Sequence, residues 1–171
     1  VRILGEACAE LIVASSYSKN FGLYRERVGS LQIVSPNTKQ SNVVQSQLGS
    51  VVRGIYSMPP SHGAAIVESI LGDERLKTMW RKELESMRNR INLLRTELAS
   101  GLSDETSRDF SFIKTQRGMF SFLGISAAQV AKLQETYAIY MVDSSRINVA
   151  GINDTNIAYF IESMKSVLSE G

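Results

Sequence analysis

Two short apolar runs stand out near the start of the chain, after an opening segment, VRILGEACAE, that is typical of a helix. LIVAS at 11–15 and GSLQIVS at 29–35 are continuous and rich in β-branched residues. Such runs are typical of strands buried on both faces, as in a parallel sheet. We therefore expect two parallel-type strands of an α/β sheet, separated by a loop with a turn of helix near 23–25.

Helical spacing of apolar residues follows these strands. Residues 38–57 have this spacing, and the Met-Pro-Pro bend at 58–60 ends the pattern. A short helix is predicted next around 63–72, closed by Gly72. A long amphipathic helix then runs from Asp73 to Gly101, since apolar residues recur there at steps of three and four. Its apolar stripe consists of Leu76, Trp80, Leu84, Met87, Ile91, Leu94 and Leu98. At roughly 40 Å it is longer than one small core needs, so we expect it to cross between lobes.

Mixed strand and helix patterns fill the remainder. FSFI and GMFSFLGI, at 110–113 and 118–125, are strand-like, and Ser126 with Gln129 forms a capping box at the start of a helix. AIYMV and RINVAGI follow, and then a helix capped near Asn153. Its apolar face comprises Ile157, Phe160, Ile161, Met164 and Leu168.

The order of these elements predicts two domains. Two short strands would leave sheet edges unpaired and faces uncovered. We therefore predict that residues 1–72 are the C-terminal remnant of a larger α/β domain, and that residues 73–171 are the linking helix and a smaller α+β domain.

Composition narrows the function classes. The 171 residues are 43% hydrophobic, and 19 basic against 17 acidic side chains give a net charge of +2. This balance suggests no nucleic-acid or acidic-lipid partner. Without an apolar run of roughly 20 residues, we expect no membrane span and a cytoplasmic location.

Cys8 is expected to be a small buried hydrophobe, and with one cysteine and one histidine, His62, we expect no metal site and no catalytic triad. His62 is expected to cap a helix or form a hydrogen bond.

The stretch ASSYSKNFGLYRERVG at 14–29 carries the candidate chemistry. A neutral lysine amine attacks an aldehyde, and Lys19 has two hydroxyl groups, of Ser16 and Ser18, just before it. Arg27 follows eight residues later. Hydroxyls and a guanidinium bind phosphate well, so this set suits an aldehyde that carries a phosphate at its far end. Pyridoxal 5'-phosphate is such a ligand.

This stretch is compatible with two other interpretations. Ser-Lys-Asn-Phe-Gly is also compatible with a plain surface turn. Ser16 and Lys19 match the S-x-x-K pattern of serine acyl-enzymes, which also need S-D-N and K-T-G elements downstream. The sequence contains neither element. The acyl-enzyme interpretation is therefore disfavoured.

Four segments carry a resemblance to a known family: SSYSKNFGLYRERVGSL, YSMPPSHGA, RGMFSFLGIS and SSRINVAGIN. Together they resemble the aspartate and aromatic amino acid aminotransferases of fold type I, in the right order over essentially the whole chain. The resemblance implies that Lys19 is the Schiff-base lysine of pyridoxal 5'-phosphate. It also implies that Ser16, Ser18 and Arg27 bind the cofactor phosphate, and that the freed Lys19 amine is the proton-transfer base.

The same resemblance assigns substrate roles. Arg146 matches the residue that binds the substrate α-carboxylate, and Phe120 matches an aromatic near the substrate. Arg53 matches the arginine that reaches from one subunit of a homodimer into the partner's site, where it binds side-chain carboxylates. Ser57 belongs to the same intersubunit turn, although Met58 stands where an asparagine is common. Amino acids and 2-oxo acids such as 2-oxoglutarate are the implied substrates.

Part of the family's site is missing from the sequence. The aspartate that pairs with the pyridinium nitrogen precedes the lysine strand in family order, and here only Glu6 and Glu10 carry carboxylates upstream of Lys19. Trp80 is interpreted as a packing residue, because the family's ring-stacking aromatic also lies upstream. Two hypotheses follow: the chain is the C-terminal part of a transaminase for aspartate, aromatic amino acids or both, or it is a non-catalytic folded fragment that acts as a structural or association module.

Overall fold

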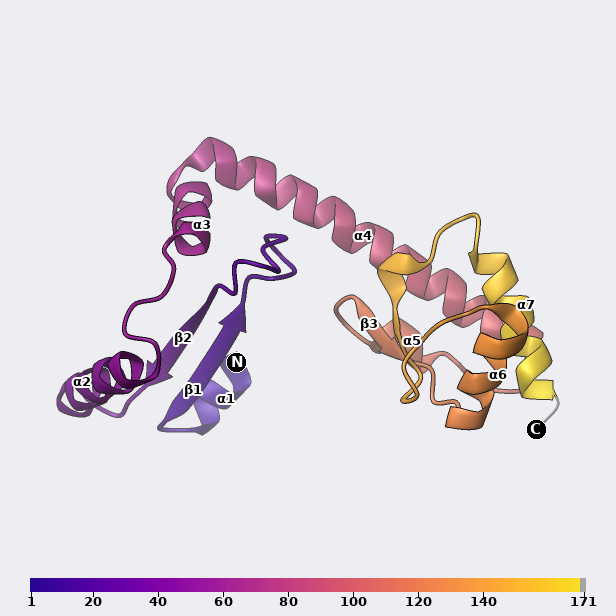
Figure 1. Ribbon diagram of the computed structural model, residues 1–171, viewed down its shortest axis with the longest axis horizontal. Helices are drawn as coiled ribbons and strands as arrows, with labels where there is room; N and C mark the ends of the chain where they lie inside the picture. The colour runs from indigo at the N-terminus through magenta and orange to yellow at the C-terminus, as the bar shows by residue number, and fades with distance from the viewer. Residues whose placement is uncertain (170–171) are drawn as a thin grey trace. The chain divides into compact units, whose positions relative to one another are not determined.

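A computed structural model describes residues 1–169 of the chain. The chain divides into two compact units, Val1–Leu84 and Glu85–Gly171. The boundary falls inside helix α4 (Glu74–Glu105), so this helix contributes to both units (Figure 1).

The first unit contains an antiparallel strand pair. After helix α1 (Arg2–Ala7), β1 (Leu11–Ser16) pairs with β2 (Gly29–Val34) in a register that runs from Leu11↔Val34 to Ser16↔Gly29. The expected parallel-type arrangement is therefore wrong. Parallel neighbours need a crossover connection, usually a helix, whereas residues 17–28 between the two strands form turns and no helix. The turn of helix that was expected near 23–25 is also wrong, because residues 24–27 form a turn.

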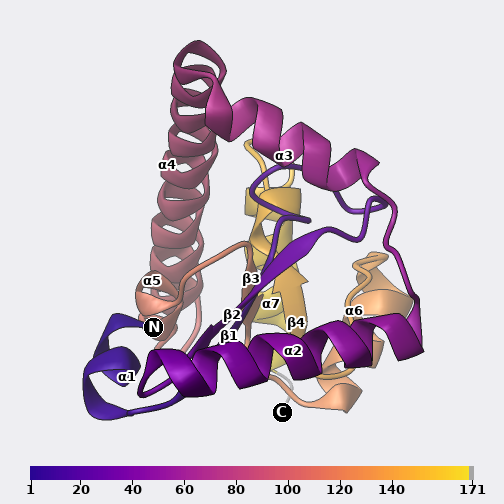
Figure 2. The same cartoon turned by 90° about the vertical axis from the view of Figure 1, so that its left-hand side faces the viewer.

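The two helices that follow were predicted. Helix α2 (Thr38–Ile55) begins where the Asn37 side chain accepts a hydrogen bond from the Gln40 backbone N–H at 3.0 Å, and α3 (His62–Gly72) ends at the predicted glycine. Figure 2 shows α2 beside the β1–β2 pair. Val44 of α2 lines a surface cavity together with residues of both strands.

The first unit has little core of its own. Ile12 of β1 is 69% exposed and Leu31 of β2 is 53% exposed, and within residues 1–84 Val67 is the only buried large hydrophobic side chain. Cys8 is exposed, so its predicted burial is wrong. Within residues 1–84, the exposed strand residues and Cys8 thus have no apolar core to pack against.

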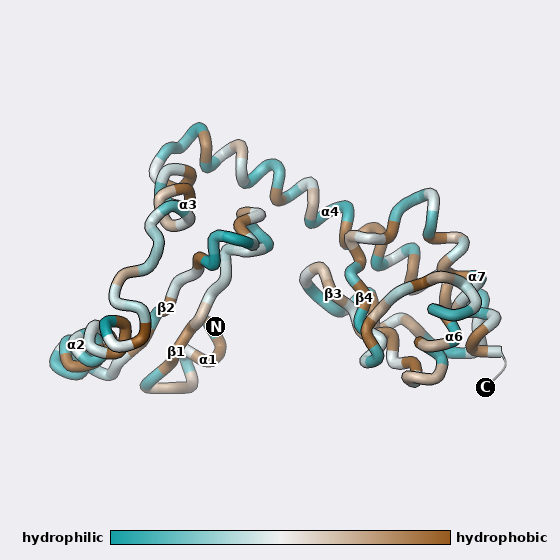
Figure 3. Tube along the Cα trace, viewed as in Figure 1, coloured by the Kyte–Doolittle hydropathy of each residue, from teal (hydrophilic) through white to brown (hydrophobic). Residues whose placement is uncertain are grey.

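Helix α4 starts one residue after the predicted start and continues four residues beyond Gly101. Hydrophobic positions recur along it between hydrophilic ones (Figure 3). Met87, in the middle of the predicted stripe, is exposed, whereas Leu94, Leu98 and Leu102 are buried in the core of the second unit.

The second unit is a small α+β fold around one core. It contains α5 (Phe112–Thr115), β3 (Phe120–Phe122), α6 (Ala127–Tyr137), β4 (Arg146–Asn148), the 3₁₀ helix η1 (Val149–Gly151) and α7 (Ile157–Ser169). The Ser126–Gln129 capping box is confirmed. The apolar face predicted for α7 is also confirmed, because its five residues all belong to this core or pack against it.

The predicted strand at 110–113 is wrong. Phe110 and Ile113 are both buried, and their spacing of three fits a helical turn better than a strand. Asp109 starts this turn, because its carboxylate accepts hydrogen bonds from the backbone N–H and the hydroxyl of Ser111, at 2.7 and 2.9 Å. These hydrogen bonds lower the pKa of Asp109.

Strands β3 and β4 pair antiparallel, with Phe120 opposite Asn148 and Phe122 opposite Arg146. The central residue of each strand, Ser121 or Ile147, is buried, and the flanking residues are exposed. The alternation therefore presents Phe120 and Arg146 on the open face. Among residues 1–169, no helix is both long and apolar enough to cross a membrane.

Candidate active site

Lys19 follows the end of β1, next to a pair of serine hydroxyls. The Ser16 hydroxyl donates to the Ser18 hydroxyl oxygen at 3.0 Å, and the Ser18 backbone N–H donates to the Ser16 hydroxyl oxygen at 3.2 Å. Ser18 is only 6% exposed, whereas Lys19 is exposed. The three predicted residues thus combine an ordered hydroxyl pair with an accessible amine.

Tyr24 connects Lys19 with Arg27. The Lys19 Nζ lies 3.7 Å from the centroid of the Tyr24 ring, within the range of a cation–π interaction. The Arg27 Nη1 donates to the Tyr24 carbonyl oxygen at 3.2 Å, and Arg27 has a left-handed backbone with φ of 52°. This turn therefore keeps the predicted phosphate-binding guanidinium on the same loop as the amine.

Trp80 of α4 packs against the Lys19 loop at Asn20 and Phe21. Its indole stacks on Phe21, with ring centroids 4.6 Å apart, and its Nε1 donates to the Asn20 carbonyl oxygen at 2.8 Å. The interpretation of Trp80 as a packing residue is confirmed. Its hydrogen bond to the residue after Lys19 was not predicted, because nothing in the sequence pairs positions so far apart. A half-buried indole N–H needs a hydrogen-bond acceptor, and this requirement was the only feature of the sequence that could have indicated the bond.

The first turn of α3 packs against the loop near Arg27. The His62 Nδ1 lies 2.9 Å from the Glu26 Oε2, which confirms the expected hydrogen-bond role of this histidine. Gly63 is buried against the same segment. A Cβ at Gly63 would lie 2.7 Å from the Glu26 Cβ and 3.1 Å from the Val28 Cβ. The close approach thus requires a glycine.

Substituting Gly63 tests this contact. We expect Gly63→Ala to lower the free energy of unfolding by about 1–3 kcal/mol, the usual range for overpacking, in a urea titration of the full-length protein. Gly49→Ala on α2 is the matched control, since no heavy atom lies within 4 Å of its added Cβ. Equal stability of the two variants would show that the loop does not pack on α3.

Arg53 and Ser57 lie at the end of α2. Arg53 is in its last turn and is exposed. Ser57 follows the helix with φ of 61°, and its backbone N–H donates to the Val52 carbonyl oxygen at 3.0 Å. Within the described residues neither side chain contacts Lys19.

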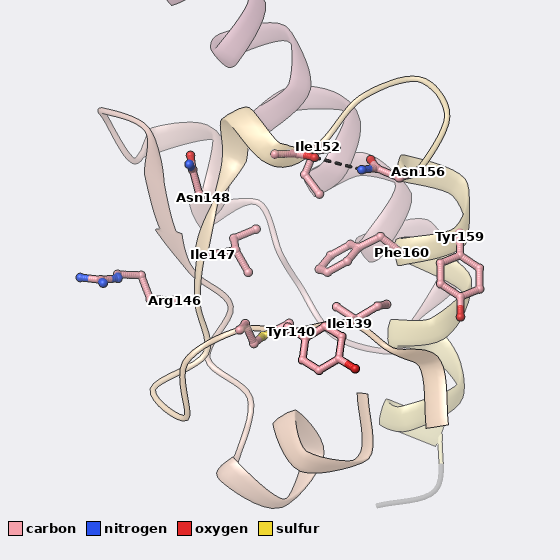
Figure 4. A pocket seen from close by; sticks show the side chains of 11 residues that line it. Ile139, Tyr140, Arg146, Ile147, Asn148, Ile152, Asn156, Tyr159 and Phe160 are labelled. Carbon is pink, nitrogen blue, oxygen red and sulfur yellow. Dashed lines mark hydrogen bonds between the residues drawn. The ribbon is translucent and has the colours of Figure 1, made fainter. Parts of the chain in front are cut away.

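Arg146 and Phe120 come together on the second unit. The Arg146 Cζ lies 4.9 Å from the centroid of the Phe120 ring, which is 39% exposed. Figure 4 shows the Arg146 side chain pointing away from Phe160 and Tyr159. The preceding residue, Ser145, is buried, and its hydroxyl oxygen accepts a hydrogen bond from the Gly124 N–H at 3.1 Å. The guanidinium is thus presented outward from a fixed strand, where a carboxylate can reach its N–H groups.

A cavity of about 350 Å³ lies beside Arg146. Its lining is mostly apolar, and it includes Ile147, Tyr140 and Phe160 (Figure 4). The Asn156 side-chain N–H donates to the Gly151 carbonyl oxygen at 2.9 Å and so closes the loop between η1 and α7.

Arg95 is a buried cation that the sequence analysis missed. It is 1% exposed and lies on α4 beside Leu94 in the core. Burial lowers the pKa of its guanidinium, and the nearby charge of Arg117 lowers this pKa further. An arginine next to the apolar stripe of a helix was the signal that could have found it.

Comparisons with known proteins identify the family of the chain. Residues 1–164 match the family model described as aminotransferase class I and II. The chain belongs to this aminotransferase family. The fold class that the resemblance implied is therefore confirmed.

Individual relatives match nearly all of this chain. It is 47% identical to the aspartate aminotransferase of Salmonella typhi over 93% of its own length, and 41% identical to the aromatic-amino-acid aminotransferase of Pseudomonas aeruginosa over 99%. A crystal structure of the aromatic-amino-acid aminotransferase of Burkholderia pseudomallei, covalently bound to pyridoxal phosphate, superimposes with a TM-score of 0.91 at 43% identity. That match covers 98% of this chain and 42% of the other.

The matched relatives are longer than this chain. It spans 40% of the Salmonella typhi protein and 43% of the Pseudomonas aeruginosa protein. Within residues 1–169, no group of three or more His, Cys, Asp or Glu side chains is placed to hold a metal ion.

Proposed function

We propose that this chain is part of a pyridoxal-phosphate-dependent aminotransferase that acts on aspartate, aromatic amino acids or both, with 2-oxoglutarate as the amino acceptor. Membership of the aminotransferase family supports the reaction class. The observation that carries the proposal is the Lys19 loop, where an exposed amine follows a hydrogen-bonded pair of serine hydroxyls, one of them buried, and lies on the same loop as Arg27.

The residues of this loop fit the cofactor. Ser16, Ser18 and Arg27 offer hydroxyl and guanidinium donors for a phosphate dianion, and the amine of Lys19 is accessible for an aldehyde. The buried Oδ1 of Asn20, next to Lys19, lacks a hydrogen-bond donor within residues 1–169. The hydroxyl, guanidinium and amine groups of this loop therefore support the proposal of a phosphorylated aldehyde as the ligand. When bound, pyridoxal 5'-phosphate supplies an electron-withdrawing ring that stabilises negative charge on the substrate α-carbon.

Each residue then has a defined task in the proposed reaction. Lys19 would hold the cofactor covalently when it is bound, and its amine, once released from that bond, would move a proton at the substrate α-carbon. Arg146 binds the α-carboxylate through two parallel N–H donors, and the Phe120 ring packs against that guanidinium. Arg53 binds the second carboxylate of a dicarboxylic substrate in the partner subunit of a homodimer, and Ser57 lies near the same intersubunit site.

A direct assay tests the proposed function. The full-length protein with pyridoxal 5'-phosphate is incubated with aspartate and 2-oxoglutarate, and in a second reaction with phenylalanine and 2-oxoglutarate. We expect glutamate and the matching 2-oxo acid to form in equal amounts in at least one reaction. No amino transfer in either reaction would contradict the proposal.

Arg53 allows a sharper test of substrate choice. We expect Arg53→Leu to lower kcat/KM for aspartate about a hundredfold or more, because two charge-assisted hydrogen bonds are lost, and to change kcat/KM for phenylalanine by less than about fivefold. Arg75→Leu is the control, an exposed arginine on α4 that contacts Met79. An equal loss with both substrates would contradict a role in side-chain recognition.

A structural or association role is the second candidate for the isolated chain. The observation in its favour is the exposed apolar surface of the first unit, including Ile12 and Leu31 on the strands. We expect the 171-residue chain with added pyridoxal 5'-phosphate to transaminate no amino acid, since it spans about two fifths of its relatives. Release of oxaloacetate from aspartate above the blank would contradict this expectation.

A further inference from the structure

The guanidinium of Arg95 is surrounded by backbone acceptors of the segment that leads into β3. Its Nη2 donates to the carbonyl oxygens of Gly118 and Phe120, both at 2.7 Å. Its Nη1 donates to the Ile113 carbonyl oxygen at 3.3 Å and to the Ser121 hydroxyl oxygen. In the described part of the chain, Arg95 forms no ion pair with a carboxylate. The charge is therefore neutralised only by oriented dipoles.

These bonds occupy the outer edge of β3. Hydrogen bonds to the β4 side of the sheet flank β3 at both of its ends. The Leu123 N–H donates to the Ser145 carbonyl oxygen at 3.0 Å, and the Val149 N–H donates to the Met119 carbonyl oxygen at 2.8 Å. Backbone groups alternate along an antiparallel strand, so the Phe120 carbonyl faces away from β4. A buried carbonyl needs a donor. Arg95 supplies that donor in place of a third strand.

An arginine is a costly way to fill this position if packing were its only role. A buried cation loses its hydration, and apolar side chains of similar volume usually stabilise a core as well or better. Its planar fork, however, reaches four acceptors in fixed directions, which a lysine ammonium cannot do. The arrangement thus fixes the backbone of Phe120 with a precision that packing alone does not give.

We propose that Arg95 is a positioning residue for the carboxylate site. Arg95 fixes the backbone of Phe120 at the edge of β3, and the Phe120 ring, 4.9 Å from the Arg146 Cζ, sets the direction in which that guanidinium points. Arg95 touches no substrate and acts only through Phe120 and Arg146. This inference rests on the proposed function, because it assigns Arg146 to the substrate carboxylate.

The substitution Arg95→Lys in the full-length protein tests the inference. We expect KM for aspartate to rise about tenfold, since small misplacements of a binding group are costly, and kcat to change by less than about threefold. Absorbance of the bound cofactor and its borohydride-fixed attachment to Lys19 should stay as in the wild type. Arg88→Lys is the matched control, an arginine on the same helix whose exposed side chain pairs with Glu85 at 2.9 Å. An unchanged KM in Arg95→Lys would overturn the inference.

A double-mutant cycle separates positioning from a general structural role. If Arg95 acts through Arg146, Arg95→Lys raises KM little further in an Arg146→Ala background. The same fold-rise in both backgrounds would overturn the inference. If Arg95→Lys does not yield folded protein, Ser121→Ala replaces it in the cycle, because this substitution removes a single acceptor of Arg95. We expect Ser121→Ala to raise KM for aspartate about threefold in the wild-type background and not in the Arg146→Ala background. No rise in Ser121→Ala would then count against the inference.

The same data distinguish this inference from the proposed function. An Arg146→Ala variant that keeps the wild-type KM would contradict the proposed carboxylate site and the inference with it. A raised KM in Arg146→Ala, together with an unchanged KM in Arg95→Lys, would contradict the inference alone.

Discussion

Replacing Lys19 with alanine is expected to lower the transamination rate of the full-length protein by at least about a thousandfold. Proton transfer by a positioned base contributes about 10²–10⁴ in rate, and the same substitution removes the covalent attachment of the cofactor. The measurement is the single-turnover conversion of aspartate at saturating cofactor, followed by absorbance. The exposed amine beside Tyr24 and the Ser16–Ser18 hydroxyl pair is the structural basis of this expectation.

Lys39→Ala is the matched control for that experiment. Lys39 is an exposed lysine in the first turn of α2, away from the Lys19 loop in sequence. We expect wild-type turnover in this variant. Wild-type turnover in Lys19→Ala as well would exclude Lys19 as the catalytic amine.

The second large effect is expected at Arg146. Arg146→Ala should raise KM for every amino acid and 2-oxo acid substrate by about a hundredfold or more, because each hydrogen bond to a charged group is worth about 1.5–3 kcal/mol and two are lost. Steady-state kinetics with aspartate and with phenylalanine measure this effect. All substrates share the α-carboxylate, so the loss should not depend on the side chain, in contrast to Arg53→Leu.

The control for Arg146 is Arg88→Ala on the exposed face of α4. It removes the same charge from the same unit without touching β3 or β4, and we expect unchanged KM values. A loss in Arg146→Ala that is confined to dicarboxylic substrates would contradict its assignment to the α-carboxylate.

Local sequence patterns predicted most helices well. The long helix, the Ser126–Gln129 capping box and the apolar face of α7 depend on contacts between residues three or four positions apart, which periodicity reports directly. The direction of β1 and β2 depends on the connection between them, and the exposure of the strand residues and of Cys8 depends on what packs against them. An apolar run does not contain that information, so a continuous run indicated a buried parallel sheet where the structure has an exposed antiparallel pair.

The candidate site shows the same division. Ser16, Ser18 and Lys19 are neighbours in sequence, and their interactions follow from local geometry. Trp80 and Arg95, by contrast, act on segments far away along the chain, through acceptors on the backbone. Every residue has a backbone carbonyl, so a bond to one leaves no pattern in the sequence. No motif therefore indicated that either side chain supports the site.

Trapping the amine chemically tests the central proposal most directly. The full-length protein is mixed with pyridoxal 5'-phosphate, reduced with borohydride, digested and mapped for the modified lysine. We expect one major labelled peptide that carries the cofactor on Lys19, and strong suppression of labelling by excess inorganic phosphate. Label spread evenly over surface lysines such as Lys39 and Lys82, with Lys19 no more reactive than the rest, would contradict the proposal that this loop holds the cofactor.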